Sequence, residues 1–308
     1  RIAENAMANF QHLLLIASPQ MHRTSAFERA VALAKVSNAA LHIVAFDYME
    51  TLAIVGVFNQ GAMAELREGY LQMHRHWLEQ EAEYERKNGL EVTTQLFWTQ
   101  HVVDEIRQYV DTQQAEMVIK DVHQESTLKR IFFTPLDWQL LRDCPVPVHV
   151  VIDSANPLPH KIVAAVNLFR SADADLQLND IIIETASRLA TQCDGVLQML
   201  YVFDGAAVYA SGFTIMGAMP IEADFVDALG DAHLEAFVAL AEYYGIAKEN
   251  AYYLKGTPLP AIKKFAADNA VDVLVMGTRP HHNLDLVLGD TAENILQHAP
   301  CSVLVVKA

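Results

Sequence analysis

Short apolar runs recur along the whole chain, and most of them lack the polar alternation of a half-exposed strand. Runs rich in valine and leucine are typical of parallel strands that are buried on both faces. The predicted strands cover residues 12–17, 40–46, 91–98, 116–120 and 146–152, and then 161–167, 196–203, 250–254, 271–276 and 302–306. This pattern predicts a sheet protein with parallel strands.

Helical periodicity fills the intervals between these runs. Two long helices are expected over residues 64–87 and 221–244, and shorter ones over 102–113 and 175–192. Asn88-Gly89 is a good end signal for the first long helix, because both residues tolerate left-handed backbone. Strands that alternate with helices indicate an α/β fold.

The second half of the chain repeats the first. Residues 115–120 match residues 271–276 at an offset of 156, and Cys144-Pro145 matches Ala299-Pro300 at an offset of 155. We therefore predict two tandem, doubly wound, Rossmann-like domains, each with a five-stranded parallel sheet. Their predicted bounds are residues 7–153 and 160–308, with a proline-containing linker between them.

Composition narrows the class of protein. The 308 residues are 52% hydrophobic and 19% charged, with a net charge of −16, so buried cores are expected and nucleic-acid binding is not. No apolar run is long enough to cross a membrane. Three cysteines that are far apart in sequence fit a reducing compartment, so we expect a cytoplasmic protein.

The end of the chain carries a recognisable motif. Gly277-Thr278-Arg279, Gly289 and the segment from Ala292 to the last strand resemble the end of universal stress proteins. Residues 131–138, which read Ile-Phe-Phe-Thr-Pro-Leu-Asp-Trp, are similar to a motif of the E-type tandem members from bacteria. The resemblance implies a non-catalytic role in stress resistance. It also implies that the two domains imitate, within one chain, the usual dimer of the family; a homodimer of the whole chain is a further option.

In nucleotide-binding members of that family, the motif is glycine, two residues, glycine, nine residues, glycine and then serine or threonine, and it holds the phosphates of ATP. Here Pro280 replaces the second glycine, and a proline has no N–H to offer a phosphate. Only eight residues separate Pro280 from Gly289, and Asp290 brings a negative charge to the hydroxyl position. These departures argue against ATP, which stays an alternative, and no other cofactor is expected.

The second repeat keeps more of a ligand site than the first. The first repeat ends its opening strand with Ala17-Ser18 and has Lys120-Asp121 in place of the glycine loop, so Lys120 is expected to pair with Asp121 or Asp137. The second repeat keeps glycines where a backbone can approach a ligand. The predicted ligand-binding residues are Val166, Asn167, Leu168, Met276, Gly277, Thr278, Arg279, Gly289, Asp290, Thr291 and Ala292.

Several patterns leave alternatives open. The methionine-rich stretch within residues 205–220 fits packing, or a wall for an acylated or nucleotide-linked amphipathic metabolite. His281-His282, and the pair His74 and His76, fit solvated surface better than a metal site. No catalytic set of residues can be assembled, so an enzyme is not expected. The functions considered are a stress protein that binds a small ligand, a metabolite carrier or sensor, and an ATP-dependent switch.

Overall fold

A computed structural model describes residues 9–47, 60–125, 130–152, 156–168, 173–209, 223–278 and 290–307. The chain divides into two compact units. The first unit contains the described parts of residues 9–124 and 133–158. The second unit contains the described parts of residues 159–308, together with Glu125 and residues 130–132.

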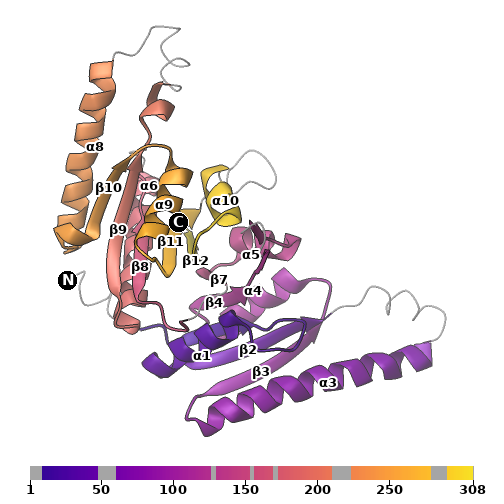
Figure 1. Ribbon diagram of the computed structural model, residues 1–308. Coiled ribbons are helices and arrows are strands. Elements are labelled where there is room, and N and C mark those ends of the chain that lie inside the picture. Colours follow the sequence, from indigo (N-terminus) through magenta and orange to yellow (C-terminus); the bar gives the residue numbers. More distant parts are fainter. Residues whose placement is uncertain are drawn as a thin grey trace. The chain divides into compact units, whose positions relative to one another are not determined.

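The first unit is built on a sheet of five parallel strands, as predicted (Figure 1). The strands run in the order β7-β4-β1-β2-β3, which is the order of a doubly wound sheet. Their bounds are β1 His12–Ile16, β2 Ala40–Asp47, β3 Val92–Trp98, β4 Met117–Asp121 and β7 Val148–Val151. The accompanying helices are α1 Ser25–Ser37, α3 Gln60–Lys87, α4 Val102–Gln113 and α5 Pro135–Asp143.

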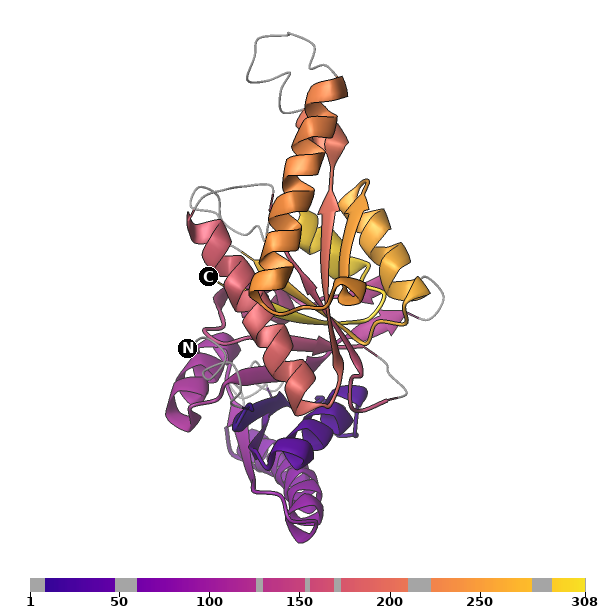
Figure 2. The same ribbon diagram turned by 90° about the vertical axis from the view of Figure 1, so that its left-hand side faces the viewer.

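The second unit repeats this arrangement, with strand order β10-β9-β8-β11-β12. Its strands are β8 Lys161–Ala165, β9 Val196–Phe203, β10 Ala251–Lys255, β11 Val273–Thr278 and β12 Ser302–Lys307. Its helices are α6 Asp173–Gln192, α8 Ala223–Tyr243, α9 Pro258–Asp268 and α10 Asp290–Gln297, with a short 3-10 turn, η1 Lys248–Asn250. Figure 2 shows α6 and α8 on the same side of this sheet.

The central strands are buried on both faces, as their unbroken apolar sequence requires. Leu13, Leu14 and Leu15 of β1 are fully buried, although neighbouring side chains of a strand point to opposite faces. The central strand β8 of the second unit behaves in the same way over residues 162–164. Helices on both faces exclude water from these strands, and the loops at the strand ends are left to carry function.

A two-stranded hairpin was not anticipated from the sequence. Strands β5 His123–Glu125 and β6 Arg130–Phe132 pair with each other, outside the main sheets. Strand β6 belongs to the second unit, where it contacts α10, although it comes from the first repeat. It coincides with the start of the motif at residues 131–138.

An ion-pair cluster fastens α3 to α1 in the first unit. The carboxylate of Glu85 on α3 is almost fully buried and lies 2.8 Å from Arg23 and 2.9 Å from Lys35. Arg23 also reaches Glu81 at 2.8 Å and lies over the ring of Phe27. Burial acts to raise the pKa of Glu85, but hydrogen bonds from Lys35 and Arg23 outweigh it and hold this pKa below its ordinary value of 4.5.

Replacing Glu85 with glutamine should therefore weaken the first unit in a pH-dependent way. We expect the variant to lose about 1.5–3 kcal/mol of unfolding free energy at pH 7, because hydrogen bonds to a charged group are lost. Since the folded pKa is lowered, the carboxylate's contribution is present above pH 4.5 and disappears as the pH falls through the folded pKa. Urea unfolding at several pH values measures both effects.

The matched control is Glu83→Gln on the same helix. Glu83 pairs with Lys87 at 2.8 Å, but both side chains are well exposed. Because solvent screens an exposed pair, it adds little to stability, so this variant should be close to the parent. Equal losses in the two variants would show that the Glu85 cluster does not fasten α3.

Candidate functional site

Two groups of predicted site residues come together at one end of the second unit's sheet. Strands β8 and β11 are paired neighbours, with Ala165 opposite Met276. The residues that follow, Asn167 after β8 and Thr278 at the end of β11, therefore lie at the carboxyl edge of adjacent strands. This edge is where open α/β sheets bind ligands.

A side-chain amide holds the backbone at Asn167. Asn179 of α6 is buried, and its Oδ1 accepts a hydrogen bond from the Asn167 N–H at 2.9 Å. Its Nδ2 donates to the Asn167 carbonyl oxygen, also at 2.9 Å. The oxygen and the nitrogen of the Asn179 side chain thus both hold the backbone of the loop after β8. Asn167 itself is exposed.

Gly277 has a structural reason to be glycine. A Cβ atom at this position would lie 2.6 Å from Cγ of Leu178, on α6, which is closer than real Cβ contacts allow. Gly277 is not among the residues with positive φ. The close approach expected here from the sequence is therefore made by a leucine of the same unit.

The remaining predicted residues differ in what they can offer a ligand. Val166 and Met276 are each 6% exposed and Thr278 is 4% exposed, so these three form the floor of the edge. Leu168 is half-buried. Asp290, Thr291 and Ala292 form the first turn of α10, and their side chains lie outside the described residues, as do Arg279 and Gly289.

Other candidates from the sequence also fall outside the described residues. These are Phe213, Ile215, Met216 and Met219 of the methionine-rich stretch, and the pair His281-His282. Within the described ranges, no cluster of three or more histidine, cysteine or acidic side chains could hold a metal ion. His74 is buried and packs against Tyr70, so the solvated surface expected for it is wrong.

The corresponding edge of the first unit is occupied by an ion pair. Lys120 at the end of β4 lies 2.8 Å from Asp137, which is 3% exposed. Its Nζ also donates to the Asp121 carbonyl oxygen at 3.0 Å. Asp137 in turn accepts from the Thr134 N–H at 2.7 Å in a capping box that starts α5. The pairing predicted for Lys120 is confirmed.

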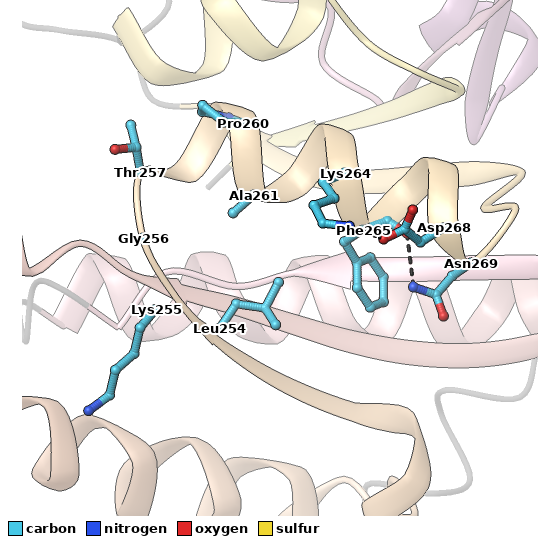
Figure 3. A pocket seen from close by; sticks show the side chains of 10 residues that line it. All are labelled: Leu254, Lys255, Gly256, Thr257, Pro260, Ala261, Lys264, Phe265, Asp268 and Asn269. Carbon is cyan, nitrogen blue, oxygen red and sulfur yellow. Dashed lines mark hydrogen bonds and ion pairs between the residues drawn. The ribbon is translucent and has the colours of Figure 1, made fainter.

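A pocket that the sequence did not indicate lies between β10 and α9. It has a volume of about 500 Å³, within the range of sites for small ligands. Figure 3 shows Leu254 and Phe265 directed into the space between the strand and the helix, with Lys255 directed away from α9. The lining residues are Leu254, Lys255, Gly256, Thr257, Pro260, Ala261, Lys264, Phe265, Asp268 and Asn269.

Aromatic side chains under α8 complete this end of the second unit. The Tyr201 hydroxyl lies 2.7 Å from Nδ1 of His233, and the Tyr253 hydroxyl donates to the Gly230 carbonyl oxygen at 2.7 Å. Burial raises the pKa of Tyr201 and lowers the pKa of His233. Both groups are therefore neutral at pH 7, and they serve to pack α8 on β9 and β10.

Comparison with known proteins identifies the family of this chain. The universal stress protein family matches the chain twice, over residues 9–151 and 160–307. The chain belongs to the universal stress protein family. The two matches confirm the tandem organisation that the internal repeat predicted.

Two relatives of this universal stress protein are similar to it over nearly their whole length. It is 29% identical to Universal stress protein E of Escherichia coli K12, over 98% of this chain and 95% of the relative. Identity to the protein of the same name from Photorhabdus laumondii is 27%, over 98% and 96% of the two chains. These similarities confirm the E-type resemblance.

A solved structure supports the fold. A functionally unknown protein from Pseudomonas aeruginosa PAO1 aligns with a TM-score of 0.71 over 98% of this chain and 94% of its own, at 23% identity. At this identity, the similarity concerns the fold alone.

Among the described helices, none is long and apolar enough to cross a membrane.

The contact between Gly277 and Leu178 can be tested by a double-mutant cycle. Gly277→Ala should lower the free energy of unfolding by about 1–3 kcal/mol, because the added methyl group overpacks against Leu178. Adding Leu178→Ala should recover part of that loss, which urea denaturation of all four proteins would measure. Additive losses would mean that the two positions do not interact.

Proposed function

We propose that this chain is a non-catalytic stress protein whose second unit binds a small ligand at the carboxyl edge of β8 and β11. The observation that carries the proposal is the Asn179 amide, which fixes the Asn167 backbone through two hydrogen bonds while the Asn167 side chain stays exposed. The backbone that carries this polar side chain is therefore held in place, which lowers the ordering cost of binding a partner. The site comprises the residues predicted from Val166 to Leu168, from Met276 to Arg279 and from Gly289 to Ala292.

The chemistry of this edge favours a ligand other than ATP. Leu178 covers the backbone of Gly277, the first glycine of the motif that holds phosphate in nucleotide-binding relatives. Pro280 removes a backbone donor, and Asp290 adds a negative charge. The apolar floor and the exposed amide suit an amphipathic metabolite, such as an acylated or nucleotide-linked compound.

The first unit has a different role in this proposal. Its Lys120–Asp137 ion pair occupies the end of β4, so in this proposal the edge supports the fold rather than a ligand. The protein then acts in the cytoplasm, within stress resistance, as a carrier or sensor without turnover. The pairing of the two repeats as an internal dimer, and the absence of nucleic-acid partners, remain predictions.

Thermal unfolding with added compounds tests the ligand site. The probes are Mg-ATP and a panel of sugar nucleotides and acyl thioesters, each with the full-length chain. We expect at least one panel compound to raise the melting temperature; a ligand at 100 times its Kd stabilises by about 2.7 kcal/mol. The shift should vanish in Asn167→Ala and persist in Ser18→Ala, the matched position at the end of β1.

Calorimetric titration with Mg-ATP tests the nucleotide alternative. No binding heat is expected from the parent protein. Leu178 covers the backbone of Gly277, Pro280 lacks a backbone donor and Asp290 adds a negative charge. Micromolar binding that is lost in Asn167→Ala would contradict this and would make the protein a nucleotide-regulated switch. Release of ADP during the titration would contradict the non-catalytic role.

A further inference from the structure

The pocket between β10 and α9 lies beside an open edge of the second unit's sheet. Strand β10 is the last strand in the order, and its five residues are Ala-Tyr-Tyr-Leu-Lys. The first four are only half-buried, which is unusual for such an apolar strand. Exposed apolar edges pair readily with another strand, and natural proteins commonly guard them.

The backbone groups that face outward can be assigned. The Gly256 N–H donates to the Phe203 carbonyl oxygen of β9, so residue 256 faces the sheet. Because successive residues of a strand point their backbone groups to alternate sides, Tyr253 and Lys255 direct theirs away from β9. Within the part of the chain that the structure describes, these outward groups make no hydrogen bond.

The side chains of β10 alternate between the two faces of the sheet. Tyr253 contacts α8 through its hydroxyl, and Lys255 reaches toward Gly230 of the same helix. On the opposite face, the Tyr252 ring lies 4.7 Å from that of Phe265, and Leu254 lines the pocket with it. A strand added at this edge would place every second side chain against the pocket (Figure 3).

The first unit shows how the same edge is closed. Its edge strand β3 carries Phe97, which faces Tyr109 of α4 with ring centroids 5.7 Å apart and stacks on Phe46 at 5.2 Å. In addition, Arg86 donates from Nε to the Val92 carbonyl oxygen at 2.8 Å. The Leu41 N–H of β2 donates to the Glu91 carbonyl oxygen, so the backbone groups of the next residue, Val92, point away from β2. Arg86 therefore binds an outward carbonyl oxygen of the edge strand.

The second unit lacks these two devices: it has Glu242 of α8 where α3 has Arg86, and no ring where β3 has Phe97. Leu254 stands where the first unit has Phe97, and Ala261 of α9 stands where α4 has Glu105. Leu254 and Ala261 line the pocket together with Phe265.

Charge favours an acidic partner. Residues 248–268 hold four lysines and two acidic residues, a net charge of +2, within a chain of −16. Lys255 lies at the carboxyl end of β10, and Lys264 lies on the α9 wall of the pocket, where it pairs with Asp268 at 2.6 Å. A single carboxylate of a short peptide would gain from these lysines, whereas a second copy would bring its whole net charge of −16 to the contact.

We propose that the β10–α9 groove binds an extended peptide by strand addition. The partner pairs its backbone with the outward groups of Tyr253 and Lys255. It places one apolar side chain in the pocket over Phe265 and an acidic residue beside Lys255. This protein-binding surface is distinct from the ligand edge of β8 and β11, and it does not depend on that edge being occupied.

Selection from a displayed library of nine-residue peptides tests this surface. The full-length protein is the target, and the Ala261→Trp chain removes peptides that bind elsewhere, because tryptophan would fill the groove. We expect enrichment of sequences with alternating β-branched residues, a central apolar residue and an acidic residue near one end. No enrichment, or enrichment of sequences without these features, would overturn the proposal.

Fluorescence polarisation with one enriched, labelled peptide then separates the possible binding modes. Methylating alternate backbone nitrogens should weaken binding about tenfold, because hydrogen bonds of strand pairing are lost. Ala261→Trp should weaken it at least tenfold, whereas Glu105→Trp, the matched change on α4, should leave it within twofold. Unchanged binding of the methylated peptide would show that the groove takes an isolated side chain or a small molecule instead.

Two further measurements distinguish loss of peptide binding from loss of folding and from self-association. Leu254→Phe restores the residue type of the first unit and should weaken peptide binding without lowering the melting temperature, so failure to fold cannot explain the loss. Analytical ultracentrifugation of the parent and of Ala261→Trp tests self-association. A dimer that Ala261→Trp dissociates would assign the groove to a second copy and overturn the peptide proposal.

Discussion

Both units depend on the burial of a central parallel strand on both faces of its sheet. Strands β1 and β8 hold this position, and their consecutive apolar side chains are all excluded from water. Such strands require helices above and below, which in turn require long right-handed crossovers between parallel neighbours. Two places then remain for function: the loops at the carboxyl edge and the outermost strand.

The two repeats have different residues at both of these places. At the carboxyl edge, the first unit has an ion pair between Lys120 and the buried Asp137, whereas the second has an exposed amide at Asn167. At the outermost strand, the first unit has Phe97 and a capping arginine, whereas the second has Leu254 and an open groove. Both differences are the reasons why we propose binding in the second unit and structural support in the first.

Much of the fold could be predicted from the sequence because its signals are local. Valine- and leucine-rich runs located the strands, and the offset of 156 residues located the repeat. The hairpin of β5 and β6 was missed, since strands of three residues carry too few positions to show a period. Its placement in the second unit depends on contacts with α10, which no local pattern reports.

The candidate site was only partly predictable, for the same reason. The sequence identified Gly277 and Asn167 as site residues, but not that Leu178 supplies the close contact or that Asn179 holds the loop. Those partners lie on α6, and they meet the strand ends only through folding. The pocket beside β10 could not be predicted either, because its lining joins residues of β10 and α9 that come together only in the folded unit.

The central claim is that ligand binding belongs to the second unit alone. Native mass spectrometry of the full-length protein, purified under non-denaturing conditions from its own cells, tests it most directly. The account predicts one added ligand mass per chain, and none on the Asn167→Ala protein prepared in the same way. Two ligands per chain, or a ligand that Asn167→Ala retains, would contradict it.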